Sequence, residues 1–196
     1  MNTRTHLAAL AAAVCAGLAG AAWAGDVVCL EAESAIEVTA PMLRTDIAFP
    51  PDGKSSAVLA SSSGGRYLEI PEGAGKPPEA GGDATIEFTL DQAGTYTLWC
   101  RVWWLDGCGN SLGIAINGGK DFTFGQDATY KKWHWVRSPP RLEQLMLSAG
   151  KHTLKLMNRE DGIAIDQILL TVNPRFIPVG IEKPTPQPKP ATPTTP

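Results

Sequence analysis

Hydrophobic and polar residues alternate along most of the chain between residues 27 and 172. In residues 84–90, Ile86, Phe88 and Leu90 fall on one side of an extended segment and polar residues fall on the other. Short segments of this kind are separated by turns rich in glycine and proline. The sequence contains no helical stripe of useful length with apolar residues at i, i+3, i+4 and i+7. About ten short strands without helices predict an all-β fold, an antiparallel β-sandwich.

Ten strands are expected along the chain, and residues 95–104 have the clearest strand composition among them. They cover residues 27–33, 66–70, 84–90, 95–104, 112–117, 121–124, 132–137, 141–147, 151–157 and 163–172. Residues 95–104 are dominated by aromatic and β-branched side chains, which favour a long strand. Alternation places one set of its side chains towards the core and the other set outwards. The inward set is Tyr96, Leu98, Cys100, Val102 and Trp104, and the outward set is Thr97, Trp99, Arg101 and Trp103.

The two ends of the chain differ in composition from this central region. Residues 1–24 have the features of a signal peptide: Arg4 is followed by an apolar run, Leu7–Ala22, and Ala22–Ala24 forms an A-x-A cleavage site. We therefore expect a protein that is secreted, periplasmic or on the cell surface, with no membrane span after cleavage. Its β-sandwich would cover residues 25–177. Residues 178–196 are rich in proline and threonine, which predicts an extended tail, either a spacer or a frayed end.

Charge and cysteine content narrow the possible partners. Without Arg4 the chain has 16 basic and 20 acidic residues, a net charge of −4, and no basic stripe that would bind nucleic acid or anionic lipid. Three cysteines remain after cleavage: Cys29, Cys100 and Cys108. In an oxidising compartment one disulfide can form in three possible pairings, and one thiol is left over. The pair Cys100 and Cys108 is the local option.

Three stretches together resemble carbohydrate-binding modules of the family 6 and family 35 type. They are Leu30-Glu31-Ala32-Glu33-Ser34-Ala35, the central strand 93–102, and the closing strands 149–156 and 161–168. Their order and spacing agree with the family over residues 28–172. The resemblance implies a galactose-binding-like jelly-roll β-sandwich that binds poly- or oligosaccharides without catalysis and carries a structural calcium ion.

Glu31 and Glu33 are two residues apart on an expected strand, so both carboxylates would leave the same face. Two like charges this close are unfavourable unless they are solvated or bridged by a cation. Calcium prefers several carboxylate and carbonyl oxygens, which this pair could begin to supply. The alternative is a solvated acidic edge. The resemblance adds Asp166 as a third calcium ligand, so we predict a metal site at Glu31, Glu33 and Asp166.

Sugars present apolar C–H faces that stack on exposed aromatic rings, while polar side chains bind their hydroxyl groups. Trp133 and Trp135 fall on one face of their expected strand and belong either to the core or to a binding platform. The end of the long strand and the loop that follows it are the expected location of a ligand. The predicted ligand-binding residues are Trp103, Trp104, Asp106, Asn110 and Tyr130.

One position departs from the family pattern. Family 6 modules usually place an asparagine two residues before the closing aspartate, where it contacts sugar, and this chain has Ala164 there. Either Asn110, Asp106 or Asn158 substitutes for it, or sugar binding has been lost.

The sequence contains no paired carboxylates placed as in a glycosidase and no nucleophile motif, so we do not expect an enzyme. The alternative function is that of a structural or adhesive protein of the cell surface or envelope, which would use the same fold to contact other proteins.

Overall fold

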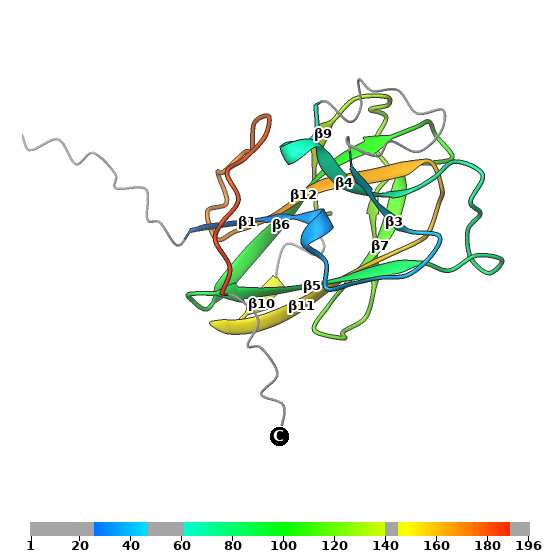
Figure 1. The fold of residues 1–196 in the computed structure, drawn as a ribbon. Coiled ribbons are helices and arrows are strands. Elements are labelled where there is room, and N and C mark those ends of the chain that lie inside the picture. Colours follow the sequence, from blue (N-terminus) through cyan, green and yellow to red (C-terminus); the bar gives the residue numbers. More distant parts are fainter. Residues whose placement is uncertain (1–25, 47–60, 140–144, 189–196) are drawn as a thin grey trace, which may run out of the picture.

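The computed structural model describes residues 26–46, 61–139 and 145–188 (Figure 1). These residues form two antiparallel β-sheets packed face to face, which confirms the predicted all-β sandwich. The predicted signal peptide, the first four residues of the expected strand 141–147 and the last eight residues of the predicted tail lie outside the described ranges. No helix in the described ranges is long and apolar enough to cross a membrane.

The larger sheet is built around the two longest strands of that sheet, β6 (Gly94–Trp104) and β12 (Ile163–Thr171), which pair along most of their length. In the described part of the chain this sheet has seven strands, and β1 pairs with β12 while β9 pairs with β6. The remaining strands of this sheet are β1 (Val27–Glu31), β3 (Leu43–Asp46), β4 (Arg66–Ile70), β9 (His134–Arg137) and β10 (Leu145–Leu147).

The smaller sheet has five strands within the described residues, in the order β2, β5, β11, β7, β8. Two short 3₁₀ helices, η1 (Ala32–Ser34) and η2 (Ser63–Gly65), lie in the connections. The strands of this sheet are β2 (Glu37–Val38), β5 (Asp83–Leu90), β7 (Ser111–Ile116), β8 (Phe122–Gly125) and β11 (Gly150–Met157).

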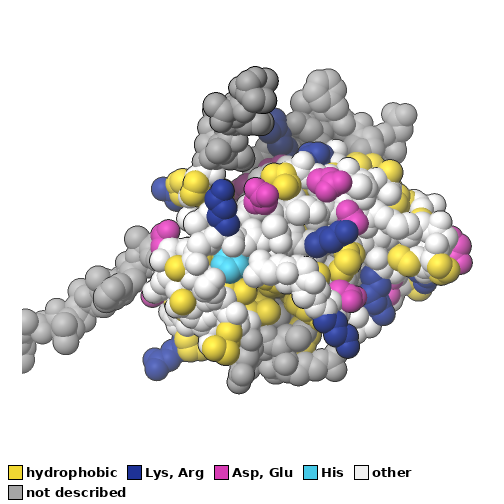
Figure 2. Space-filling model, turned by 90° about the horizontal axis from the view of Figure 1, so that it is seen from below, with side chains coloured by type: hydrophobic (Ala, Val, Ile, Leu, Met, Phe, Trp, Pro, Cys, Tyr) yellow, Lys and Arg dark blue, Asp and Glu magenta, His cyan; other side chains and the backbone are white. Residues whose placement is uncertain are grey.

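The core lies between the two sheets and follows the predicted alternation. The inward residues of β6 are all buried, from Tyr96 to Trp104, and they meet Ile86, Phe88 and Leu90 of β5 in one continuous cluster. Burial of this apolar area is the main stabilising contribution to the fold. On the face shown in Figure 2, acidic and basic side chains are interspersed and do not gather into a basic stripe.

The cysteines are not linked. Cys29, Cys100 and Cys108 are free thiols, so the expected disulfide is absent among them. Cys29 lies opposite Leu169 and Cys100 lies opposite Ile168, so β12 separates the strands that carry them. Because side chains at successive positions of a strand leave opposite faces, these two sulfur atoms also lie on different sides of the sheet. The three thiols therefore belong to different environments.

Residues 177–188, which we call the C-terminal arm, have no regular secondary structure but are packed on the sandwich and run beside β1 (Figure 1). The Thr185 amide donates to the carbonyl oxygen of Cys29 at 2.8 Å, and the Cys29 amide donates to Oγ1 of Thr185 at 3.0 Å. The Thr89 amide donates to Oε1 of Gln187 at 2.8 Å. The hydrogen-bonded domain therefore extends past the predicted boundary at residue 177, and the first part of the predicted tail is anchored to it.

Candidate functional site

The outer face of the larger sheet carries four half-buried tryptophans, which we call the tryptophan face: Trp99, Trp103, Trp133 and Trp135. Trp99 and Trp103 are outward residues of β6, as the alternation predicts. Trp135 lies on β9 directly opposite Arg101 of β6. Trp133 precedes β9 in the chain. Strand pairing between β6 and β9 therefore assembles aromatic residues that lie thirty or more positions apart in the sequence.

Contacts beneath the tryptophan face hold its rings in place. Buried Tyr67 and Ala164 form a small cluster against which Trp103 and Trp133 pack, separate from the main core. The rings of Tyr67 and Trp133 meet edge to face, with centroids 5.4 Å apart. The Arg101 guanidinium carbon lies 5.3 Å from the centre of the Trp133 ring, a cation–π contact. These rings are preorganised before any ligand arrives.

A groove of about 330 Å³ opens along the part of the tryptophan face that carries Trp99, Trp133 and Trp135, between the sheet and the C-terminal arm. This volume is at the lower end of the range of about 300–1,000 Å³ that is usual for ligand pockets. The groove is lined by Trp99, Arg101, Trp133, His134, Trp135, Ile177, Pro178, Val179 and Gly180.

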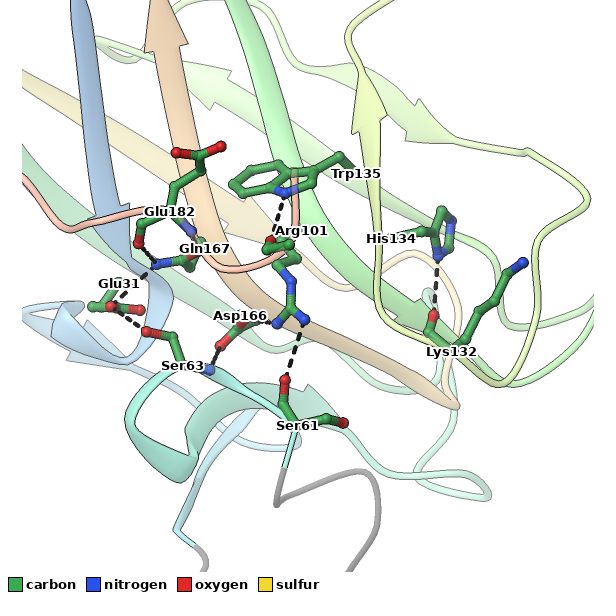
Figure 3. A network of polar contacts seen from close by, with 11 residues as sticks. Glu31, Ser61, Ser63, Arg101, Lys132, His134, Trp135, Asp166, Gln167 and Glu182 are labelled. Carbon is green, nitrogen blue, oxygen red and sulfur yellow. Dashed lines mark hydrogen bonds and ion pairs between the residues drawn. The ribbon is translucent and has the colours of Figure 1, made fainter. Parts of the chain in front are cut away.

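A polar network lies below this surface and connects it to the predicted metal ligands (Figure 3). Arg101 forms a buried ion pair with Asp166 and also donates to the carbonyl oxygen of Ser61 at 3.1 Å. The Ser63 amide donates to the other oxygen of Asp166 at 2.9 Å, and its hydroxyl donates to Oε1 of Glu31 at 2.6 Å. The same Glu31 oxygen accepts a hydrogen bond from Gln167 Nε2 at 3.2 Å. Both oxygens of Asp166 are thus engaged by the protein.

The acidic pair is arranged differently from the sequence-based expectation. Glu31 ends β1, whereas Glu33 lies in η1, so the two carboxylates do not share one strand. The Ser34 hydroxyl donates to the carbonyl oxygen of Glu31 at 2.6 Å and helps to turn the chain here. Burial is the main cause that raises the pKa of Glu33 to about 7, and the negative charges of Glu31 and Asp166 contribute to this shift. The three carboxyl groups are therefore close enough to interact.

Two of the three predicted metal ligands have carboxylate oxygens that the protein leaves without a partner. Oε2 of Glu31 and Oε2 of Glu33 are both buried without a hydrogen-bond partner, and such carboxylate oxygens are the ligands that calcium prefers. Asp166 is held by Arg101 and Ser63, and no group of three or more His, Cys, Asp or Glu side chains in the described ranges has the spacing of a metal site. Glu31 and Glu33 therefore each leave one buried carboxylate oxygen without a partner, whereas both oxygens of Asp166 are already engaged.

The structure contradicts the assignment of Trp104 as a ligand-binding residue. Trp104 is an inward residue of β6 and is 0 % exposed. Its ring packs in the main core and meets the His134 ring edge to face, with centroids 6.3 Å apart. A ligand cannot reach it in this conformation. Trp103, its neighbour, points outwards because successive side chains of a strand leave opposite faces.

The other residues predicted to bind the ligand belong to the loops at the end of β6. Oδ1 of Asp106 accepts hydrogen bonds from the amides of Cys108 and Gly109, at 2.7 and 3.2 Å, and so closes its own loop. The Asn110 amide donates to Oε2 of Glu160 at 3.1 Å. Tyr130 is exposed, and its hydroxyl lies beside Gly107 of the same loop. These residues gather around one loop, whereas the aromatic surface lies on the sheet.

Asn158, the third residue considered as a substitute for the missing asparagine, and Ala164, which occupies its position, also have defined places. Nδ2 of Asn158 donates to the carbonyl oxygens of Gly75, Ala80 and Gly81, at 3.0, 3.4 and 2.7 Å, and Asn158 is buried. It therefore clamps the loop of residues 71–82 and is not available to a ligand. Ala164 lies opposite Trp103 and is buried beneath the tryptophan face.

Sequence reasoning left the role of Trp133 and Trp135 open and did not assign Trp99 or Arg101 to a site. The alternation within β6 did place Trp99, Arg101 and Trp103 on one outward face. What it could not supply was the partner strand, because the pairing of β6 with β9 joins distant residues. The position of the C-terminal arm against Trp135 left no signal in the sequence.

Neither the protein-family models nor the curated protein sequences give a match to this chain. Solved structures do. A family 35 carbohydrate-binding module from Clostridium thermocellum matches with a TM-score of 0.51 and 17% identity, over 74% of this chain and 96% of that one. A GH26-CBM35 beta-(1,4)-mannanase from Podospora anserina matches with a TM-score of 0.55 and 20% identity, over 79% of this chain.

An exo-beta-1,3-galactanase from Phanerochaete chrysosporium, solved with galactose, matches with a TM-score of 0.52 and 14% identity over 74% of this chain. This chain spans 29% of the length of the mannanase chain and 29% of the galactanase chain. At these identities the likeness concerns the fold alone. The protein has the fold of carbohydrate-binding modules, as the sequence resemblance predicts.

Proposed function

We propose that this protein binds poly- or oligosaccharides without catalysis, and that the tryptophan face is the surface that binds them. The observation that carries the proposal is the arrangement of Trp99, Trp103, Trp133 and Trp135, half-buried on one face of the larger sheet. A contiguous patch of four large aromatic residues that are partly open to solvent is typical of a surface that a ligand covers.

The chemistry of the surface suits sugar rings. The C–H groups of a pyranose stack on the flat face of an indole, and rings held in advance lose little conformational entropy on binding. The edge-to-face contact with Tyr67 and the cation–π contact with Arg101 hold Trp133, so its orientation does not depend on the ligand. The shared fold with carbohydrate-binding modules supports this function, and the family 35 module matches over 96% of its own length.

A structural calcium ion held by Glu31 and Glu33 is the second part of the proposal. Two buried carboxylate oxygens without partners support it, since an uncompensated buried charge costs free energy that a divalent cation would offset. The ion would stabilise the junction of β1 and η1. Chelation with EDTA is then expected to lower the Tm, and added calcium to restore it. An unchanged Tm would contradict the calcium proposal and leave the sugar proposal intact.

The signal-like residues 1–24 support export, so the binding would take place outside the cytoplasm. The end of the chain beyond the C-terminal arm is rich in proline, which suits a spacer between the sandwich and a surface or partner. Detection of the cleaved protein in the culture medium, periplasm or cell-surface fraction tests this.

The sugar proposal is tested with the mature chain on a glycan array, beside three variants. Trp103→Ala and Trp133→Ala remove rings from the tryptophan face, and Tyr130→Ala removes the exposed ring at the loop end. We expect the first two to lose at least tenfold in affinity and the third to keep it. Loss only in Tyr130→Ala would move the site to the loop. Silence against all glycans would favour the alternative, a structural or adhesive protein that uses this fold for protein contact.

A further inference from the structure

The C-terminal arm approaches the tryptophan face through a short turn, residues 177–180. The indole nitrogen Nε1 of Trp135 donates to the carbonyl oxygen of Gly180 at 2.9 Å (Figure 3). The Val179 amide donates to Oε1 of Glu182 at 2.9 Å, which closes the turn with a side chain of the arm itself. Gly180 has a φ of 66°, a left-handed conformation that glycine adopts without strain. The turn is therefore a defined structure.

The position of this turn is set by the last strand of the sheet. Gln167 of β12 is fully buried, and its side-chain amide pairs with the backbone of Glu182. The Glu182 amide donates to Oε1 of Gln167 at 2.9 Å, and Nε2 of Gln167 donates to the Glu182 carbonyl oxygen at 2.8 Å. Further along, Thr185 is bonded to β1 through Cys29. The arm is thus held to β12 at Glu182 and to β1 at Thr185, directly after the turn.

Hydrogen bonds and the buried Pro178 hold the arm, while two aliphatic side chains of the turn are largely exposed. Ile177 is 71% exposed and Val179 is 79% exposed. Both line the 330 Å³ groove together with Trp99, Trp133 and Trp135. Anchoring by hydrogen bonds explains how the turn stays in place, but it does not explain why its outward residues are aliphatic. Aliphatic side chains exposed on a fixed turn beside an aromatic groove indicate contact with a ligand.

We propose that the turn of residues 177–180 is a wall of the sugar site, and that the groove between this wall and the tryptophans selects pyranose rings with apolar C–H groups on both faces. The inference rests on the proposed sugar binding at the tryptophan face. It adds Ile177 and Val179 as residues that determine specificity.

The selection follows from the chemistry of the lining. The sheet supplies indole rings and the arm supplies aliphatic side chains, so a ring in the groove meets apolar groups from two elements. A β-linked glucose or xylose unit has equatorial hydroxyl groups and directs axial C–H groups to both faces. Galactose has an axial hydroxyl at C4, so one of its faces is polar. Burying that hydroxyl against an apolar wall without a hydrogen-bond partner costs free energy.

The experiment measures affinities of the mature full-length chain by calorimetry, with cellotetraose, xylotetraose and a β-linked galactotetraose as probes. The variant Ile177→Ser/Val179→Ser removes the apolar wall while leaving the backbone hydrogen bonds of the arm in place. Met146→Ser is the matched control, because Met146 is also 79% exposed but does not line the groove. The Tm of each variant shows whether the fold is retained.

We expect wild type to prefer the gluco- and xylo-configured probes at least tenfold over the galacto-configured one. The double variant should lose most of this preference, and Met146→Ser should keep it. If Trp133→Ala abolishes binding but the double variant binds all probes as wild type does, the wall is overturned and the sugar site stands. A preference for galactotetraose overturns the selection. Absence of binding to any probe or array glycan overturns the sugar site and, with it, this inference.

Discussion

The Arg101 guanidinium joins the two halves of the candidate site through its ion pair with Asp166. The side chains of this pair are 8% and 0% exposed, so the contact lies inside the protein. On one side Arg101 stacks against Trp133 of the tryptophan face. On the other, Asp166 borders the carboxylates of Glu31 and Glu33, and its charge raises the pKa of Glu33. The register of β12 shifts between Ile165 and Gln167, at the position of Asp166.

Replacing Arg101 with methionine is expected to destabilise the protein by about 3–5 kcal/mol, because it leaves Asp166 as a buried carboxylate without its charged partner. Urea unfolding at neutral pH measures the change. Arg137→Met is the matched control: Arg137 is exposed and its guanidinium carbon lies 6.0 Å from the Trp99 ring, so we expect a loss below about 1 kcal/mol. Equal losses of unfolding free energy in the two variants would show that the buried pair contributes no more to stability than an exposed arginine does.

Trp104→Ala and Trp133→Ala should separate stability from binding. Trp104 is wholly buried, so its truncation is expected to cost about 3–5 kcal/mol of unfolding free energy. Trp133 is half-buried, so its truncation should cost less stability but remove most of the sugar affinity. Thermal unfolding and calorimetric binding of the two variants side by side make the comparison. A folded Trp104→Ala protein that has lost binding, with Trp133→Ala unaffected, would contradict the assignment of the outer face.

The metal-free protein should become more stable as the pH falls from 8 to 5. Burial raises the pKa of Glu33 from 4.5 to about 7 and that of Asp166 from 3.8 to about 6. A group whose pKa is higher in the folded state binds its proton more tightly there. Its stabilising effect is therefore complete below the unfolded pKa and is lost as the pH rises through the folded pKa. The Tm measured in EDTA across this range tests the sign.

Glu33→Gln provides the control for this pH dependence, because the amide cannot titrate. We expect its Tm to change less with pH between 5 and 8 than that of wild type, and to respond less to calcium. A wild-type Tm that falls steadily on acidification through this range, with the same slope in Glu33→Gln, would show that Glu33 is not the responsible group.

The thiols should differ sharply in reactivity. Burial raises the pKa of Cys29 to about 12 and also raises the pKa of Cys100, whereas Cys108 is exposed. Because the thiolate is the reactive form, a thiol reagent at pH 8 should modify only Cys108 in the folded mature protein and all three cysteines after unfolding without reductant. Cys108→Ser should show no fast reaction. Fewer than three thiols in the unfolded protein would reveal a disulfide.

The alternation of apolar and polar residues was sufficient to predict the all-β class, the inward face of β6 and most strands. It also placed Trp99 and Trp103 on the outward face. It wrongly placed Glu31 and Glu33 on one strand. In the structure the strand ends at Glu31 and η1 follows, and the alternation of residues does not distinguish this from a strand that continues to Glu33. It also selected Trp104, because an aromatic residue near a loop does not reveal whether its side chain enters the core.

Local patterns along the chain therefore determined the strands, their core-facing residues and their outward aromatic residues. These features depend on the two-residue period of a β-strand. Only the tertiary structure brought Trp135 opposite Arg101, placed Ala164 and Tyr67 beneath the tryptophans, and laid the C-terminal arm against the groove. Those relationships depend on which strands pair and where a proline-rich segment finds hydrogen-bond partners. Contacts between residues far apart in the chain decide both, and no local spacing encodes them.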